Sequence, residues 1–453
     1  MWNKEYKDCL DYIDSFWDLT IHKPEKRVVN HHVVTIPRAY ITPNNKKFNF
    51  MFYWDSFFIL RGLIGTKREW LLKDMVENFV FIFTKYGIIP NFNAPASMGR
   101  SQPPFLTSMI LDTYNGYYFK YLKRKKTKKL FLFNLKRYQV WLKKVTDVAV
   151  QEYEKIWLDS EGFYNHKVRG YMLARYGDRD IGYAHSSELE SGWDFTSRFY
   201  NRCDDFLPID LNVLLFKYER DFGKINQHLG DLNEEINWKG IAEKRKKEIN
   251  TLMWNEEAGF FFDYDYANKR QSEFLSLAGF TPLWAGIATP EQAEKMIKML
   301  KSFETPYGLT ITAKESLAPK VDLSKLPEQY LPAIEEILIP KQWDYPNSWP
   351  PLEYLTVIGL LKYGYIRDAK RLMEKYIKIH AKIFREHKTF FEKIDAVKGD
   401  IGEDFHYNNQ GGFGWTNAAF YRYIQILDAL ERGDNIYAEP KAEVAPFKLS
   451  IIH

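Results

Sequence analysis

The sequence predicts an all-α fold, a toroid of paired helices with short strands between them. Helical periodicity dominates the 453 residues and fits about a dozen helices. Strand signals are shorter and are confined to residues 258–266 and 308–312, each a candidate arm of a β-hairpin. No glycine-rich loop follows a strand, which argues against a fold that binds dinucleotides or nucleoside triphosphates. Since no Ser/Gly-rich linker divides the chain, we expect a single domain over residues 1–453, although the length alone suggests three.

Residues 68–86 give the clearest helix. Six apolar side chains, from Leu72 to Tyr86, recur there at spacings of three and four and form one face of an amphipathic helix. Gly87 follows as a C-cap, because a residue without a side chain readily takes a positive φ. A similar ending is expected at Gly364, and a looser one at Gly223. Further helices are predicted over residues 104–123, 128–156, 212–222, 233–253, 290–302, 352–361, 366–384 and 416–432.

Two segments depart from the helical pattern. Residues 314–338 contain three prolines and a short acidic helix, and we expect them to form a lid over a pocket. The C-terminal tail, residues 438–453, contains Pro440 and Pro446 and has little periodicity. We expect this tail to pack against the surface or to be partly mobile.

Composition excludes several classes of protein. A net charge of +5 is small for this length, and the basic runs at 123–129 and 244–247 are interpreted as solvated helix faces, so no nucleic-acid partner is expected. No run of about 18 apolar residues could span a membrane, and the acids near the N-terminus argue against a secretory signal. Cys9 and Cys203, the only cysteines, form neither a disulfide framework nor a metal cluster. We therefore expect a cytoplasmic protein without a metal site.

Aromatic side chains make up 17% of the chain, more than ordinary packing requires. Some of them lie beside polar residues in loops. The first such loop, Phe52–Asp55, ends in an acid that either caps a helix or, with Trp54, grips a sugar by its hydroxyls and its apolar C–H face. The second loop, Ile89–Pro104, is stiffened by prolines. Its planar donors suit recognition of several hydroxyls at once and belong to Asn91, Arg100 and Gln102.

The third loop, Glu190–Arg198, contains a candidate catalytic acid. Asp194 lies between two aromatic residues and close to Glu188. An acid in apolar surroundings with carboxylate neighbours keeps its proton more readily than a free one, as a general acid near neutral pH requires. The alternative interpretation is a helical ion pair between Asp194 and Arg198.

Two more loops complete the set. Lys341–Pro351 holds two tryptophans, an acid and two amides among three prolines, which exclude a regular helix. Phe391–Asp395 is followed by His406–Asn417, whose glycines allow close approach of the backbone, and Trp415 precedes a new helix. Aromatic and polar side chains thus recur together in five places outside the helices.

In this order, the loops resemble the motif series of the α,α-trehalases of glycoside hydrolase family 37. That series runs YYWDSY, IPNGNR…RSQPP, ESGWDFSSRW, QWDAPNGWAP and GGGEYxxQxGFGWTNG. The chain has FYWDSF, IPNFNA…RSQPP, ESGWDFTSRF, QWDYPNSWP and HYNNQGGFGWTN, spread over residues 43–432. The resemblance implies an (α/α)6 barrel with its pocket at the loop-bearing end, a small saccharide substrate, first of all trehalose, and hydrolysis with inversion.

Carried across position by position, the resemblance implies individual roles. Asp194 falls on the general acid, and Glu392, in FEKID, falls on the general base that activates a water on the opposite face of the sugar. Such a reaction needs no metal or organic cofactor. Arg175, in LARYGD, falls on a third pocket arginine, although the residues around it match poorly. The full set implied to bind the sugar is Lys47, Trp54, Asp55, Asn91, Arg100, Gln102, Arg175, Gly192, Trp343, Asp344, His406, Gln410 and Trp415.

Four positions depart from the family pattern. Lys47 replaces an arginine, so a guanidinium that donates two parallel hydrogen bonds becomes a compact ammonium. Phe50 replaces a glutamate, Ala94 an arginine, and His406 the glutamate of GGGEY. The catalytic pair is therefore retained, whereas the shell around the substrate is altered.

These departures leave alternatives open. Glucosidases of family 63 use the same acid and base on other α-glucosides or on mannosylglycerate, and Lys47 and His406 suit an anionic or differently linked aglycone. A carbohydrate-binding protein that has lost catalysis fits the altered shell, but the presence of both Asp194 and Glu392 argues against it. A helical scaffold whose rings serve only as core leaves the polar loops unexplained. The oligomeric state is not predicted.

Overall fold

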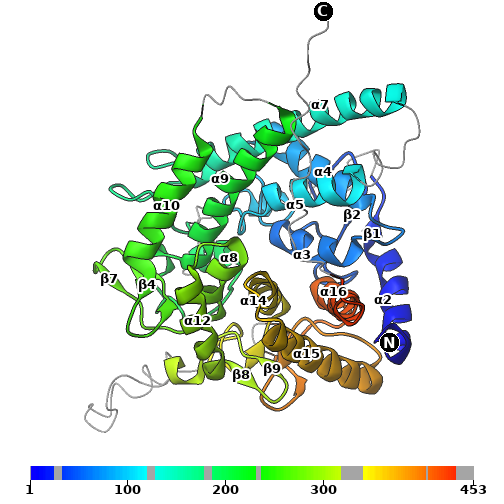
Figure 1. Cartoon of the computed structure of the whole chain (residues 1–453), viewed down its shortest axis with the longest axis vertical. Helices are drawn as coiled ribbons and strands as arrows, with labels where there is room; N and C mark the ends of the chain where they lie inside the picture. Colours follow the sequence, from blue (N-terminus) through cyan, green and yellow to red (C-terminus); the bar gives the residue numbers. More distant parts are fainter. Residues whose placement is uncertain are drawn as a thin grey trace, which may run out of the picture.

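The computed structural model describes residues 2–24, 33–119, 128–177, 186–230, 236–317, 340–404 and 407–434, and over these residues it is the predicted (α/α)6 barrel (Figure 1). Among the described residues, six inner helices form a closed ring in which each contacts the next and the last contacts the first. They are α3 (Tyr53–Leu63), α5 (Leu106–Thr113), α9 (Ile209–Leu229), α11 (Thr281–Ala285), α14 (Pro350–Lys362) and α16 (Gly414–Glu431).

A second set of helices surrounds this ring. Its described members are α2 (Lys7–Thr20), α4 (Leu71–Tyr86), α7 (Lys128–Glu152), α10 (Trp238–Met253), α12 (Pro290–Lys298) and α15 (Ile366–His387). Helix α4 packs on α3 and α5, α10 on α9, and α15 on α14 and α16. In Figure 1, α3, α14 and α16 lie near the centre of the molecule, whereas α2, α10 and α15 lie at its edge.

The burial of the helices explains the two layers. Helix α14 buries every residue except Lys362, and α3 buries every residue except Arg61. A helix that is apolar all round needs partners on every side and therefore belongs to the inner ring. Helix α15, by contrast, buries one stripe that includes Met373, Tyr376 and Phe384 and exposes its charged face.

Glycines allow the inner helices to approach closely. A Cβ on Gly62 of α3 would lie 2.6 Å from the Cα of Ala418 in α16. A Cβ on Gly359 of α14 would lie 2.8 Å from the Cβ of Leu283 in α11. Real side chains do not tolerate such distances, so glycine is required where these helices cross.

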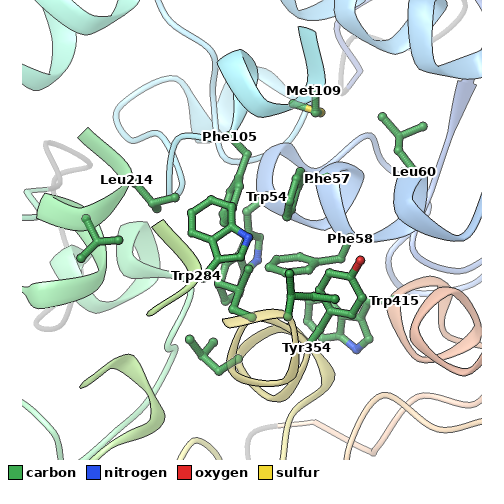
Figure 2. Packing of buried hydrophobic residues seen from close by; sticks show 14 of the residues in the cluster. Trp54, Phe57, Phe58, Leu60, Phe105, Met109, Leu214, Trp284, Tyr354 and Trp415 are labelled. Carbon is green, nitrogen blue, oxygen red and sulfur yellow. The ribbon is translucent and has the colours of Figure 1, made fainter. Parts of the chain in front are cut away.

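Aromatic rings from different inner helices meet inside the barrel (Figure 2). The ring centroids of Phe57 and Phe105 are stacked 4.3 Å apart, and Trp284 of α11 lies edge-on to Phe57 at 6.2 Å. Phe58 meets Tyr354 of α14 at 6.4 Å. Part of the high aromatic content is thus core, as the large ring of helices requires.

The strands are short hairpins between helices. The three-stranded sheet β10 (Asn347–Ser348), β11 (Ile394–Asp395) and β12 (Asp400–Ile401) joins two of the motif loops, with Asn347 paired to Asp395 and Ser348 to Ile394. The other strands are β1 (Ile21–His22) with β2 (Tyr40–Ile41), β3 (Phe206–Leu207) with β6 (Tyr264–Asp265) and β7 (Arg270–Gln271), β4 (Trp254–Asn255) with β5 (Phe260–Phe261), and β8 (Glu304–Thr305) with β9 (Gly308–Leu309). All of these pairs are antiparallel.

Short helical turns complete the described elements. They are the α-helices α1 (Trp2–Glu5) and α8 (Ser186–Ser191), the 3-10 turns η1 (Pro95–Ser97), η4 (Cys203–Asp205), η5 (Leu277–Phe280), η6 (Met299–Ser302) and η7 (Lys314–Leu317), and the π-helices η2 (Tyr114–Phe119) and η3 (Tyr153–Trp157). The two π-helices continue α5 and α7, so the predictions of helix over 104–123 and 128–156 are correct in place but not in type at their ends. Residues 120–123 lie outside the described residues.

The helix endings test the glycine signals. Gly87 and Gly364 both adopt left-handed φ, at 77° and 83°, which confirms the predicted endings there. The ending at Gly223 is wrong: α9 continues to Leu229, and Gly230 takes the left-handed conformation. Gly223 stays helical because the buried face of α9 continues beyond it through Ile225, and a Cβ on Gly223 would make only an ordinary contact of 3.9 Å with Trp238.

Two further sequence expectations need comment. The sequence predicts a loop at residues 52–55, but Tyr53 begins α3, because the apolar run that follows is buried on all sides. Of the expected lid, 314–338, only Lys314–Leu317 is described, as a 3-10 turn, and the rest lies outside the described residues, as does the tail 438–453. Among the described helices, none is long and apolar enough to cross a membrane.

Candidate active site

Two carboxyls far apart in the sequence meet where the motif loops converge. Asp194 follows the short helix α8 and is half-buried, whereas Glu392 lies between α15 and β11 and is 2% exposed. The negative charge of Asp194 raises the pKa of Glu392, so the two groups lie within range of each other's field. The barrel therefore brings the predicted acid and the predicted base to one place.

The surroundings of Asp194 favour a protonated carboxyl. Burial raises its pKa to about 7, and Glu188 acts in the same direction, while the charges of Arg100 and Lys393 act against it. The side-chain amide of Gln342 donates to the Asp194 carbonyl and lies 3.4 Å from its Oδ2. A carboxyl with this pKa is able to hold a proton near neutral pH and to release it to a substrate.

The alternative role for Asp194, an ion pair with Arg198, is wrong. The Arg198 guanidinium is fully buried and makes bidentate contacts with Asp210, at 2.9 and 3.0 Å, and with Asp263, at 2.8 and 2.7 Å. It also lies 4.6 Å from the centroid of Trp193. Arg198 thus anchors the loop from behind and leaves Asp194 to face the site.

Glu392 is held from several sides. The hydroxyl of Tyr407 donates to its Oε1 at 3.0 Å, and Nε1 of Trp415 donates to its backbone carbonyl at 2.9 Å. Burial raises the pKa of Glu392, whereas the neighbouring Lys393 and the Tyr407 hydroxyl lower it. These contacts fix the carboxyl and oppose the effect of burial, which dominates and raises the pKa of Glu392 to about 8.

Asp55 is a third carboxyl close enough to Asp194 and Glu392 to be affected by their charges. It is the third residue of α3, so the N-cap role is wrong: Phe52 occupies that position and makes no side-chain cap. Burial raises the pKa of Asp55 well above its usual range, and the charges of Glu392 and Asp194 raise it further. Asp55 therefore lies beside the catalytic candidates, and its contact with a sugar stays a prediction.

Five tryptophans form a continuous aromatic wall around these acids. Trp343 stacks on Trp349 with centroids 3.9 Å apart and planes inclined by 7°. Trp343 also meets Trp54 at 5.7 Å and Trp193 at 5.4 Å. Trp415 meets Trp54 at 6.1 Å and Trp349 at 5.9 Å. Four separate motifs of the sequence contribute to this one cluster.

Gly192 allows the wall to close on the acid loop. Its φ is 73°, and a Cβ there would lie 2.7 Å from Cζ2 of Trp54. Only glycine satisfies both the backbone conformation and the contact. The site role predicted for Gly192 thus has a steric basis.

Three of the predicted polar residues brace the loops. Asn91 donates to the Leu189 carbonyl at 3.0 Å, and Gln102 accepts from the backbone N–H of Trp54 at 3.1 Å. Asp344 is fully buried and accepts hydrogen bonds from the backbone N–H groups of Ser197 and Lys341 and from the hydroxyls of Thr196 and Ser197. Asp344 therefore ties the loop of Asp194 to the loop of Trp343.

The two predicted arginines lie in different surroundings. Arg100 is close enough to Asp194 to lower the pKa of that carboxyl. The Arg175 guanidinium instead donates to the Asp204 carbonyl and to the Tyr266 hydroxyl, both at 2.9 Å. The structure brings Arg100 to the acid and places Arg175 among the neighbouring loops.

Lys47 and Gln410 lie on the side of Tyr407. The exposed ammonium of Lys47 is 4.2 Å from the centroid of the Tyr407 ring. The side-chain oxygen of Gln410 accepts from Asn44 at 3.5 Å, and its backbone carbonyl accepts from the Glu392 N–H at 2.9 Å. His406 lies outside the described residues.

The sequence reasoning missed three residues beside the carboxyls. Tyr407 directly follows His406 in the motif, Lys393 directly follows Glu392, and Gln342 directly precedes Trp343. Their adjacency to predicted site residues was the available signal, but only the fold shows which way each side chain points. Within the described residues, no group of three or more His, Cys, Asp or Glu side chains is arranged to hold a metal ion.

Comparison with known proteins agrees with this geometry. The sequence profile of the trehalase family matches residues 3–428. The chain belongs to the trehalase family. It is 31% identical over 451 residues to the cytosolic neutral trehalase of Neurospora crassa, an alignment that covers 86% of this chain and 59% of the fungal protein. The chain thus spans less than two thirds of the length of that relative.

Solved structures show the same barrel. The neutral trehalase Nth1 of Saccharomyces cerevisiae superposes with a TM-score of 0.69 and 28% identity, over 87% of this chain and 74% of the yeast chain. A GH63 mannosylglycerate hydrolase from Thermus thermophilus superposes with a TM-score of 0.59 and 15% identity, over 85% of this chain and 95% of its own. The second likeness concerns the fold alone. The (α/α)6 barrel of this trehalase-family chain is therefore shared with enzymes of two glycoside hydrolase families.

Proposed function

We propose that this chain is an inverting glycoside hydrolase and that trehalose, which it cleaves to two molecules of glucose, is its best substrate. Membership of the trehalase family supports the proposal. The observation that carries it is the pairing of Asp194 with Glu392 at the tryptophan wall, where burial raises the pKa of the two carboxyls to about 7 and about 8.

In the proposed reaction, Asp194 protonates the glycosidic oxygen while Glu392 deprotonates a water that attacks the anomeric carbon from the other face. A pKa of about 7 suits Asp194 to the first step. The hydrogen bond from Tyr407 and the charge of Lys393 suit Glu392 to the second, because both favour its carboxylate. In this scheme the acid and the base are both protein side chains, and the nucleophile is water.

The sugar is proposed to lie against the tryptophan wall. Indole rings cover the apolar C–H faces of sugars. In the wall, Trp54, Trp343 and Trp415 would make these contacts. Asp55, Asn91, Arg100, Gln102 and Gln410 would supply hydrogen bonds to the hydroxyls. Arg175, Asp344 and Gly192 would hold the loops in place, and Lys47 and His406 would face the aglycone.

The test is glucose release from trehalose by the full chain, followed by proton NMR of the first product formed. Inversion gives one β-glucose and one α-glucose from each trehalose. Asp194→Asn and Glu392→Gln should each lower kcat by at least about a thousandfold, while the exposed Glu403→Gln, in the same region, should leave it unchanged. Sugar binding by calorimetry without any hydrolysis would instead identify a binding protein, and wild-type activity in either variant would refute the assignment.

A second candidate substrate class follows from Lys47. Its exposed ammonium lies beside Tyr407, the hydrogen-bond donor to Glu392, so a negatively charged aglycone such as glycerate would meet a cation there. Kojibiose, nigerose, isomaltose and mannosylglycerate should be assayed beside trehalose. A preference for mannosylglycerate that Lys47→Met removes would favour this candidate, whereas Lys46→Met serves as the exposed control.

Three coarser expectations accompany the proposal. We propose a cytoplasmic location, which the two free, buried cysteines and the cytosolic relative support. We propose one barrel domain over the chain, with residues 314–338 as a lid. Deleting 314–338 should change KM or kcat for trehalose, and unchanged kinetics would exclude a lid.

A further inference from the structure

Lys393, directly after Glu392, is a buried cation without an obvious structural use. Its side chain is fully buried, and within the described part of the chain its Nζ has no hydrogen-bond partner. A buried ammonium without such partners lowers the stability of a fold. Its presence at this position therefore points to something other than stability.

Two aromatic rings hold the ammonium beside the site. Nζ lies 5.5 Å from the centroid of Trp349 and 5.9 Å from that of Tyr407. Trp349 belongs to the tryptophan wall, and Tyr407 donates to Glu392. The Lys393 backbone is fixed by Asn409, whose side-chain amide donates to the Lys393 carbonyl at 2.9 Å. The charge is thus held at one place relative to Glu392.

The charges around the pair act in opposite directions. Burial and the charge of Asp194 favour a protonated Glu392, and Asp55 shares the same field. Lys393 and the Tyr407 hydroxyl favour the carboxylate. Lys393 itself faces Glu392, Asp404 and Asp194, which favour its charged form against the effect of burial. The ammonium therefore opposes the protonation of a carboxyl whose pKa its surroundings raise to about 8.

We propose that Lys393 is a positioning residue whose buried ammonium favours the carboxylate form of Glu392, the proposed general base, at some loss of fold stability. The inference deepens the proposed function and rests on it. It differs from a packing role in two measurable ways. A packing role predicts that removal of the side chain lowers stability and lowers activity equally at every pH. A charge role predicts a shift along the pH axis.

The first test compares Lys393→Met, Lys393→Gln and Lys393→Arg in pH profiles of kcat/KM for trehalose. Loss of the cation raises the pKa of both Glu392 and Asp194, so both limbs and the optimum should move to higher pH by about one unit in the Met and Gln variants. The Arg variant should keep the wild-type position. Lys382→Met is the matched control, because its Nζ bonds to the Gly399 carbonyl in the adjoining hairpin, away from the carboxyls. An unmoved optimum in both neutral variants would overturn the proposal.

The second test is independent of turnover. Infrared difference titration follows the protonated carboxyl band of Glu392, assigned by its absence in Glu392→Gln, and that band should persist to higher pH in Lys393→Met. Thermal unfolding should show Lys393→Met at least as stable as the wild type, and a variant that unfolds or melts earlier would overturn the charge role. If the wild type hydrolyses no glycoside but the band shifts, the proposed function fails and with it any catalytic role of Lys393, and only its electrostatic effect on Glu392 remains. If trehalose is hydrolysed but neither the limbs of the pH profile nor the band move, the proposed function stands and the inference about Lys393 fails.

Discussion

The Tyr407 hydroxyl donates a hydrogen bond of 3.0 Å to Oε1 of Glu392. This bond links the last motif loop of the chain to the proposed general base, and it stabilises the carboxylate over the neutral acid. A hydrogen bond to a charged acceptor contributes about 1.5–3 kcal/mol. Removing the Tyr407 hydroxyl should therefore change the pKa of Glu392.

Tyr407→Phe should lower kcat/KM for trehalose by about 10- to 100-fold at neutral pH, because it removes this stabilisation of the carboxylate. The pKa of Glu392 should rise, so activity is lost at a higher pH on the acid side. The pH profile of kcat/KM measures this shift. Tyr12→Phe is the control, since it removes a hydroxyl that bonds at 2.9 Å to Thr389, a neutral partner. Equal profiles for wild type and Tyr407→Phe would contradict the role of the bond.

The basic limb of the same profile should report Asp194. A general acid must be protonated, and burial raises the pKa of Asp194 to about 7. Because Glu392, which must be ionised, has a pKa raised to about 8, the profile should be a narrow bell around pH 7 to 8, and activity should fall above it. The measurement is the wild-type profile in several buffers, and activity that stays constant well above neutral pH would contradict the assignment of Asp194 as the acid.

The same raised pKa makes a prediction about stability. A carboxyl whose folded pKa lies above its unfolded value stabilises the fold while protonated, and this contribution is lost as pH rises through the folded pKa. Asp194→Asn removes the ionisation, so its melting temperature should exceed that of the wild type above pH about 7, with a difference that shrinks at lower pH. Thermal unfolding at a series of pH values measures it, with the exposed Asp204→Asn as control. A difference independent of pH would mean that Asp194 is not the titrating group.

Much of the fold could be predicted because each inner and outer helix has its own local signal. The stripe of α4 and the endings at Gly87 and Gly364 are properties of neighbouring residues, and they appear as expected. The start of α3 could not be found, because a helix buried on all sides has no amphipathic stripe to reveal it. Gly223 failed as an ending because α9 continues beyond it, with Ile225 on its buried face.

The site divides in the same way. Asp194 and Glu392 were predicted as acid and base from ordered motifs, which need no knowledge of distances. The bracing roles of Gln102 and Asp344, and the contacts of Lys393, depend on which loops the barrel brings together, and one sequence does not contain that information. The partners of Arg198, Asp210 and Asp263, could not be predicted because they are distant in sequence, and local spacing offered Asp194 only as an alternative.

Arg198 therefore allows a prediction about stability rather than catalysis. Arg198→Met would leave two buried carboxylates, Asp210 and Asp263, without their cation. Removing one partner of a buried ion pair typically costs about 3–5 kcal/mol, and we expect a loss of that size in the free energy of unfolding. Denaturant titration measures it. Arg169→Met is the control, because its pair with Glu161 is exposed and should contribute less than about 1 kcal/mol. Similar losses in both variants would contradict this account of Arg198.

Gly192 separates the effect of backbone conformation from that of contact. Gly192→Ala places a methyl group 2.7 Å from the Trp54 ring at a φ of 73°, whereas Gly87→Ala has nearly the same φ, 77°, and nothing within 4 Å. Both variants should lose about 1 kcal/mol of unfolding free energy through the left-handed backbone. Gly192→Ala should lose about 1–3 kcal/mol more, because the ring must move, and its kcat/KM for trehalose should fall at least tenfold. Denaturant titration and kinetics of the two variants measure the difference. If Gly192→Ala and Gly87→Ala had equal stability and equal activity, the Trp54 ring would move aside without disturbing Asp194. The tryptophan wall would then not position the acid.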